Sequence, residues 1–262
     1  MSRVEQVQLN SSDGVSLAGH YYGGVSDGPS YLVGHGFTGS AAQPQVAGIA
    51  EHLHSRHASV LALDFRGHGG SGGLSSVGIT EVADVAAGVD WLRARRPDAP
   101  VITLGFSMGA SIVIRHAGLG GSADAVVAVS GPGRWYERGT VPMRRVHLGL
   151  ETRLGRLALR RAFRTRVGGG WELLPVSPVE VAGAVNVPLL IVHGDADPYF
   201  GIEHPRMLAA AAPRADLWIE AGMGHAENAT GPELLDRIDD WVRTTLAPSS
   251  GRRDDESATM KT

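Results

Sequence analysis

The sequence predicts an α/β fold, with a mostly parallel, doubly wound sheet that carries helices on both faces. Three observations predict it. Short aliphatic runs alternate with segments of helical spacing. Several of these runs are apolar throughout, as strands buried on both faces are. The chain has 262 residues, of which 43% are hydrophobic, so it can bury one large core.

The elements follow from local patterns, taken in chain order. Residues 4–9 and 15–22 alternate around Ser-Ser-Asp-Gly, which predicts a hairpin. Further strands are expected at residues 31–34, 59–63, 101–106, 125–129, 188–194 and 217–219. Helices are expected at about residues 43–57 and 81–95, directly after residue 107, and at 232–246. Right-handed connections would then bring the carboxyl ends of the parallel strands to one edge, where ligands bind in such sheets.

The alternation of strands and helices stops between Gly131 and Val187. We therefore divide the chain into a core of residues 1–131 and 188–246, an insertion at 132–187, and a polar tail at 247–262. The tail is rich in serine and charged residues, and we expect it to be disordered.

Composition excludes several classes of function. The net charge of −3 and pI near 6.4 favour no nucleic-acid partner. The absence of cysteine excludes disulfides, thiolate metal ligands and a cysteine nucleophile. Residues 1–9 contain one arginine and no apolar run, so we expect no secretory signal. Because no run reaches the roughly 18 apolar residues of a membrane span, we expect a cytoplasmic protein.

The most informative segment is residues 101–110, Val-Ile-Thr-Leu-Gly-Phe-Ser-Met-Gly-Ala. A strand ends there in Gly-x-Ser-x-Gly and leads directly into a helix, which is the arrangement of a nucleophile elbow. The serine occupies a strained turn, and the flanking glycines let the backbone fold tightly around it. Ser107 is therefore the candidate nucleophile.

A serine hydroxyl needs a histidine base and an acid that orients the histidine. The strand ending at Gly194 releases the loop Asp-Ala-Asp-Pro at 195–198, and the next strand ends before Gly-Met-Gly-His at 222–225. Only His204 and His225 follow the acidic loop, and His204 lies too close to that loop in sequence to reach back from another strand. His225 is therefore the candidate base.

The loop after the strand at residues 31–34 carries Gly-His-Gly-Phe-Thr-Gly. We expect the backbone N–H groups of Phe37 and Met108 to converge on the substrate carbonyl oxygen and form an oxyanion hole. His35 and His68 are expected to hydrogen-bond the backbone rather than to take part in chemistry.

Five motifs occur in the order found in α/β-hydrolase-fold serine hydrolases. They are His-Gly-Phe-Thr at 35–38, Asp-Phe-Arg-Gly-His-Gly at 64–69, Gly-Phe-Ser-Met-Gly at 105–109, His-Gly-Asp-Ala-Asp at 193–197 and Gly-Met-Gly-His at 222–225. Over nearly its whole length the chain resembles this family. The first motif is similar to that of monoacylglycerol lipase-like enzymes and feruloyl esterases of the serine aminopeptidase S33 superfamily. The resemblance implies that residues 132–187 form a cap and that Asp197 is the catalytic acid, with Asp195 as the alternative.

The resemblance implies a serine hydrolase that cleaves carboxylic esters through an acyl-enzyme on Ser107, with no cofactor and no metal. A cofactor-free perhydrolase or haloperoxidase-like enzyme, or an acyltransferase, would use the same residues. A binding module without activity is the least favoured alternative. The expected partner is a small-molecule ester bound among apolar side chains, for which the candidates are Phe106, Trp135 and Met143 beside Phe37 and Met108. Neither the ester nor the oligomeric state follows from the sequence.

The insertion contains ten arginines between residues 134 and 166, against Glu137 and Glu151. Helical spacing places Arg153, Arg156, Arg160 and Arg164 on one stripe, roughly opposite Leu154, Ala158 and Ala162. We interpret the stripe as a solvated face whose arginines pair with acids elsewhere. The alternative is a basic lid that meets an anionic substrate or an anionic membrane surface. Either interpretation argues against the aminopeptidases of this fold, because those enzymes bind a substrate ammonium with acidic cap residues.

Overall fold

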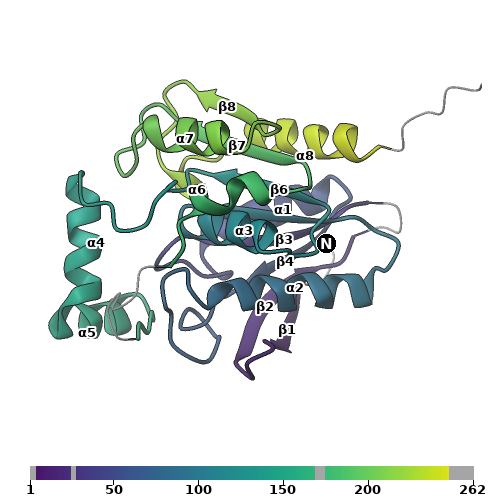
Figure 1. Ribbon diagram of the computed structural model, residues 1–262. Helices are drawn as coiled ribbons and strands as arrows, with labels where there is room; N and C mark the ends of the chain where they lie inside the picture. The colour runs from purple at the N-terminus through teal and green to yellow at the C-terminus, as the bar shows by residue number, and fades with distance from the viewer. Residues whose placement is uncertain (1–3, 25–27, 169–174, 248–262) are drawn as a thin grey trace, which may run out of the picture.

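The computed structural model describes residues 4–24, 28–168 and 175–247. Eight strands form one sheet in the order β1-β2-β4-β3-β5-β6-β7-β8 (Figure 1). The strands are β1 (Glu5–Asn10), β2 (Ser16–Tyr22), β3 (Ser30–Gly34), β4 (Ser59–Leu63), β5 (Val101–Phe106), β6 (Ala125–Val129), β7 (Leu189–Gly194) and β8 (Asp216–Glu220). The pairs β1–β2 and β2–β4 are antiparallel, and every other neighbouring pair is parallel. The predicted fold class and amino-terminal hairpin are confirmed.

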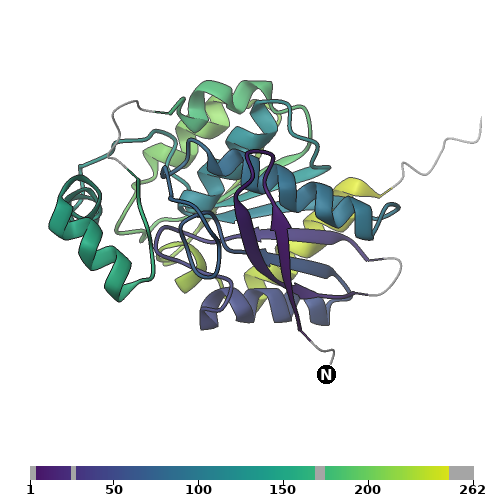
Figure 2. The ribbon, with the colours of Figure 1, turned by 90° about the horizontal axis from the view of Figure 1, so that it is seen from below.

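Helices cover both faces of the sheet (Figures 1 and 2). They are α1 (Pro44–Ser55), α2 (Glu81–Arg95), α3 (Met108–Gly118), α4 (Val141–Glu151), α5 (Arg153–Ala162), α6 (Pro178–Val181), α7 (Glu203–Ala211) and α8 (Pro232–Leu246), with short 3-10 turns η1 (Ala182–Ala184) and η2 (Ala226–Asn228). The apolar side chains of α1 and α8 pack with one set of strand residues, and those of α2, α3 and α7 pack with the alternate set. This alternation follows from the two-residue period of a strand.

Helix α7 was not predicted from the sequence. It is nine residues long and has Pro205 in its first turn, and only His204, Pro205 and Leu208 are buried. Those positions are too few to show a helical period. Because α7 leads from β7 to β8, it supplies the crossover that keeps these two strands parallel.

Of the helices in the insertion, α4 and α5 stand away from the sheet (Figure 1). Each begins at a threonine cap: the hydroxyl of Thr140 accepts the N–H of Met143 at 3.4 Å, and that of Thr152 accepts the N–H of Gly155 at 2.9 Å. The predicted arginine stripe is wrong at its end. Helix α5 stops at Ala162, and Arg164 has a φ of 53°, outside the helical region.

The predicted tail at 247–262 lies, from residue 248 onward, outside the described residues. Within the described part of the chain, no helix has the length and apolar character that crossing a membrane requires.

Three buried histidines make the stability of the fold depend on pH. Burial lowers the pKa of His35 to about 4 and that of His116 to about 4, and burial together with the neighbouring His35 lowers the pKa of His68 to about 3. In the unfolded chain these groups gain protons below about pH 6.5. The contribution of these histidines to the free energy of unfolding is therefore fully present above that pH. It is lost as the pH falls toward 4, because the unfolded state binds more protons.

We expect the free energy of unfolding to fall by about 1 kcal/mol per pH unit for each of these histidines between pH 6 and pH 4. Urea unfolding at pH 7.5, 6.0 and 5.0 measures this slope. His116 packs beside Gly121, away from the cavity described below, so H116Q is the informative variant. It should reduce the slope by the contribution of one histidine, and an unchanged slope would contradict the assignment.

Candidate active site

Ser107 lies in the turn between β5 and α3, with φ 51° and ψ −114°. A non-glycine residue at this φ is strained, and such strain concentrates at functional sites. The two glycines of the motif make the turn sterically feasible. A Cβ on Gly105 would lie 2.3 Å from the carbonyl oxygen of Gly109, and a Cβ on Gly109 would lie 2.4 Å from that of Gly34. Both positions therefore exclude any side chain.

A continuous line of hydrogen bonds joins Ser107 to loops that follow two other strands. His225 follows β8, and its Nε2 lies 2.9 Å from Ser107 Oγ. Its Nδ1 lies 2.7 Å from Oδ2 of Asp197, which follows β7. Because a carboxylate only accepts, Nδ1 carries the hydrogen, and Nε2 is left to accept the hydrogen of the serine hydroxyl. The side chain of Asp197 is 1% exposed and that of His225 is 12% exposed.

Asp197 is held by its own loop. Its Oδ1 accepts the backbone N–H groups of Tyr199 at 2.7 Å and Phe200 at 3.2 Å, which leaves Oδ2 for His225. Asp195, the alternative acid, instead accepts the N–H of Gly222 at 2.6 Å. The structure thus brings Asp197 to the histidine and leaves Asp195 on the surface.

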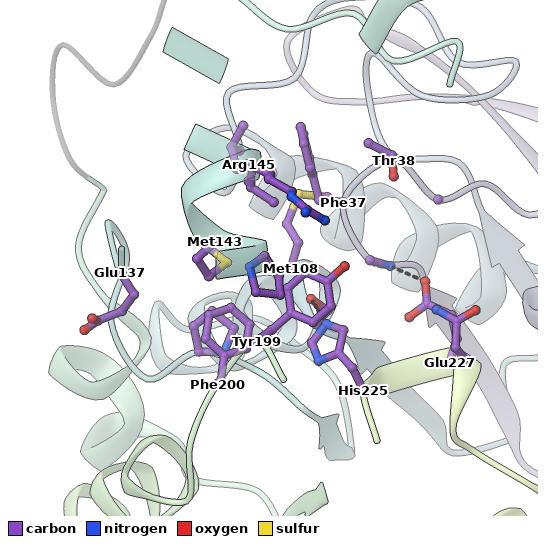
Figure 3. Close-up of a pocket in the computed structure, with 18 of the residues that line it drawn as sticks. Phe37, Thr38, Met108, Glu137, Met143, Arg145, Tyr199, Phe200, His225 and Glu227 are labelled. Atoms are coloured by element: carbon purple, nitrogen blue, oxygen red, sulfur yellow. Dashed lines mark hydrogen bonds between the residues drawn. The ribbon is translucent and has the colours of Figure 1, made fainter. Parts of the chain in front are cut away.

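Aromatic side chains that the sequence analysis missed surround the imidazole. The ring of Tyr199 stacks on His225 with centroids 4.2 Å apart, and that of Phe200 lies 5.7 Å away (Figure 3). The stacked ring of Tyr199 therefore helps to orient the imidazole that Asp197 and Ser107 hold by hydrogen bonds.

His35 fixes the loop that follows β3. Its Nδ1–H donates to the carbonyl oxygen of Gly36 at 2.7 Å, and its Nε2 accepts the N–H of Phe65 at 3.1 Å. The N–H of Gly39 also donates to this carbonyl, at 3.0 Å. In a trans peptide, the N–H of Phe37 points opposite to the carbonyl of Gly36. Burial lowers the pKa of His35 to about 4, so it stays neutral near pH 7.

Glu227 is a further residue of the site that the sequence analysis missed. It lies two residues after His225, and its Oε1 accepts the N–H of Gly36 at 3.2 Å (Figure 3). Gly36, the second residue after β3, is therefore held on both sides, its N–H by Glu227 and its carbonyl by His35. Nothing in a motif marks Glu227, because its partner is 191 positions away in the chain.

These side chains border a cavity of about 680 Å³. Its lining includes Ser107 and His225, and four of the predicted pocket residues: Phe37, Met108, Trp135 and Met143. Figure 3 shows Met143 and Arg145 entering from the insertion, with Glu227 and His225 on the other wall. The charged residues of the lining are Arg134, Glu137, Arg145 and Glu227.

Phe106 departs from the prediction that it binds substrate. It is fully buried and does not line the cavity. As the last residue of β5 it shares a face with Ile102 and Leu104, so it packs in the core beside α1 and α8.

Two histidines of α1 have partners within the fold. Nε2 of His52 lies 2.9 Å from Oδ1 of Asp236, and Nδ1 of His54 lies 3.2 Å from the carbonyl oxygen of Ala58. Among the described residues, no three His, Asp or Glu side chains are grouped as metal ligands.

The chain has relatives among known proteins. It is 29% identical, over 88% of its length, to an uncharacterised protein of Mycobacterium tuberculosis and covers 74% of that protein. It is 26% identical, over 76% of its length, to a monoacylglycerol lipase of Mycolicibacterium smegmatis and covers 82% of that enzyme. The Pyrococcus furiosus esterase Pf2001 shares its fold, with a TM-score of 0.74, 23% identity and 93% coverage of both chains.

The family model for serine aminopeptidase S33 matches residues 30–169, which is more than half of the chain. The matched region contains β3, the elbow with Ser107, and the helices α4 and α5. The chain therefore belongs to the serine aminopeptidase S33 family of α/β-hydrolase-fold proteins.

Proposed function

We propose that this protein is a serine hydrolase that cleaves carboxylic esters through an acyl-enzyme intermediate. The observation that carries the proposal is the hydrogen-bonded line from Asp197 through His225 to Ser107, which ends in a cavity with apolar walls. A serine in this arrangement is activated as a nucleophile.

In the first step Ser107 Oγ attacks the ester carbonyl carbon while Nε2 of His225 takes its proton. Collapse of the tetrahedral intermediate breaks the bond to the leaving oxygen, which receives that proton. Water then attacks the acyl-enzyme, with His225 again as the base, and releases the acid and the free serine. Asp197 keeps the hydrogen on Nδ1 and stabilises the imidazolium. This reaction needs no cofactor.

The N–H groups of Phe37 and Met108 are the proposed donors to the oxyanion. Met108 is the first residue of α3, where backbone N–H groups have no partner within the helix. The Phe37 N–H is directed by the bonds that hold Gly36. Such donors stabilise the charge that develops on the carbonyl oxygen.

Two findings favour an ester as the substrate. The Mycolicibacterium relative is a monoacylglycerol lipase, and the cavity wall contains Trp135, Met143, Val146 and Leu159, all from the insertion. We therefore also propose that residues 132–187 act as a cap, which supplies the apolar surface that binds an acyl or aromatic group.

The first experiment is labelling with a fluorophosphonate together with hydrolysis of 4-nitrophenyl esters of two to sixteen carbons. We expect Ser107 to be labelled and the chain-length optimum to report the size of the acyl pocket. Absence of labelling in folded protein would favour a binding module. Labelling with turnover only when peroxide or another alcohol is supplied would favour the perhydrolase or the acyltransferase.

A further prediction concerns Glu227, as a residue that positions the oxyanion loop. Glu227→Ala removes the acceptor of the Gly36 N–H and should lower kcat about tenfold with little change in KM, since losing an oxyanion donor outright costs a hundredfold or more. Glu227→Gln keeps an oxygen acceptor and should restore most of kcat. Steady-state kinetics on one ester measure both.

The two variants separate the role of the acceptor from other roles of the side chain. If Glu227→Gln is as slow as Glu227→Ala, then the negative charge matters and the acceptor does not. If both variants match the wild type, Glu227 does not position the loop. A change confined to KM would assign it to substrate binding.

A further inference from the structure

We infer that the outward face of the cap helices docks on an anionic lipid bilayer. We define this cap face by Leu148 of α4, by Arg153, Leu154, Leu157, Arg160 and Arg161 of α5, and by Phe163 and Arg164, which follow α5. The two helices stand clear of the sheet, so the face is accessible (Figure 1). The docking does not depend on the proposed chemistry.

The first observation is the exposure of large apolar side chains. Leu154 is 80% exposed, Leu148 64%, Phe163 54% and Leu157 42%. Single exposed leucines are ordinary on a soluble protein, but several gathered on two adjoining helices mark an interaction site. Leu159 is the one buried residue of α5, so most of the apolar surface of this helix is exposed to solvent.

The second observation is charge. Residues 134–166 carry ten arginines and two glutamates, an excess of eight positive charges in a chain whose net charge is −3. Arg138 pairs with Glu151. Arg153, Arg160, Arg161 and Arg164 form no ion pair with any described carboxylate, which removes the interpretation that their charge is neutralised by acids elsewhere in the described fold.

These four arginines also lie outside the cavity lining. A free anionic substrate bound in the cavity would therefore not meet them. Their partner must approach from outside, and it must satisfy neighbouring leucines as well as guanidinium groups.

An anionic bilayer meets both requirements. Helices that lie in a membrane interface place apolar side chains among the acyl chains and arginines at the headgroups. A nucleic acid would leave Leu148 and Leu154 in water, and a second copy of this face would bring like charges together. Helix α5 has ten residues, so it would rest on the surface.

The position of Phe163 connects the cap face to the cavity, because its half-exposed side chain also lines the cavity. Docking would therefore place the cavity mouth beside the lipid. If the proposed esterase activity is correct, an ester dissolved in the bilayer can enter without crossing bulk water.

The test is flotation of the full chain with vesicles of phosphatidylcholine alone and of phosphatidylcholine with phosphatidylglycerol at 1:1. We expect binding only to the anionic vesicles and loss of binding at high salt. The triple variant R153Q/R160Q/R161Q should bind about a hundredfold more weakly, because each basic residue near an anionic surface contributes about fivefold. L154S should bind about tenfold more weakly because one buried leucine is lost.

The matched controls are L119S and R214Q, which change an exposed leucine and an exposed arginine outside the cap and should bind as the wild type does. Absence of binding, equal binding to neutral vesicles, or equal loss in the controls would overturn the proposal. Binding that depends on the arginines but not on Leu154 would mean that the face binds polyanions in general rather than a bilayer. A dimer that L154S disrupts would mean that the face mediates self-association instead. Circular dichroism confirms that each variant is folded.

Discussion

Replacing Ser107 with alanine is expected to lower kcat/KM for ester hydrolysis about ten-thousandfold or more. The hydroxyl is the proposed atom that bonds to the acyl group, and no other described side chain accepts a hydrogen bond from or donates one to Nε2 of His225. The residual rate would come from the proposed oxyanion donors and from binding alone. Hydrolysis of 4-nitrophenyl esters under identical conditions measures the loss.

Ser111→Ala is the matched control. Ser111 lies one helical turn beyond Ser107, and its hydroxyl donates to the carbonyl oxygen of Pro132 at 2.9 Å. Its loss should cost about 1 kcal/mol of stability, as typical hydrogen bonds do, and leave turnover close to that of the wild type. If S107A retained a substantial fraction of the rate, the acyl-enzyme route would be wrong.

Replacing Asp197 with asparagine is expected to lower kcat by about ten-thousandfold while leaving the fold intact. The new side chain has nearly the same shape, and its amide oxygen can still accept the N–H groups of Tyr199 and Phe200. Its NH2 group then faces Nδ1 of His225 and donates to it. That moves the imidazole hydrogen to Nε2, where it blocks acceptance of the Ser107 proton. The single-turnover burst of 4-nitrophenol measures the acylation step directly.

Asp195→Asn provides the comparison that assigns the acid. Asp195 is exposed and accepts the N–H of Gly222, a bond that asparagine can retain. We expect its kcat to remain close to that of the wild type. An effect larger than that of Asp197→Asn would transfer the role of acid to Asp195, the alternative that the sequence left open.

Much of the fold was predictable because its signals are local. The apolar runs at β3, β4, β5 and β7 are buried on both faces, so each is continuous in sequence and easy to recognise. Helix α8 was predicted with its observed bounds, because Gly231 and Pro232 mark its start and its apolar residues keep helical spacing. Helix α7 lacks such spacing and was missed.

The residues of the site could be predicted from the direction of the strands. Ser107, Asp197 and His225 each follow a parallel strand, so the topology brings them to one edge whatever the loop details. The burial of Phe106 was also predictable from the sequence. The two-residue period of a strand places it on the same face as Leu104, which packs in the core. The strand period therefore places Phe106 in the core even though it adjoins the serine of the Gly-x-Ser-x-Gly motif.

The sequence by itself determined most of the strands and core helices, the elbow with Ser107, and His225 as its candidate base, because each depends on neighbours within a few positions or on the direction of a strand. Only the tertiary structure decided the choice of Asp197 over Asp195, the contact of Glu227 with Gly36, and the stacking of Tyr199 on His225. It also showed that Arg153, Arg160 and Arg161 of α5 are exposed and form no ion pair with a described carboxylate. These features depend on distances between side chains on separate loops, which neither periodicity nor composition encodes.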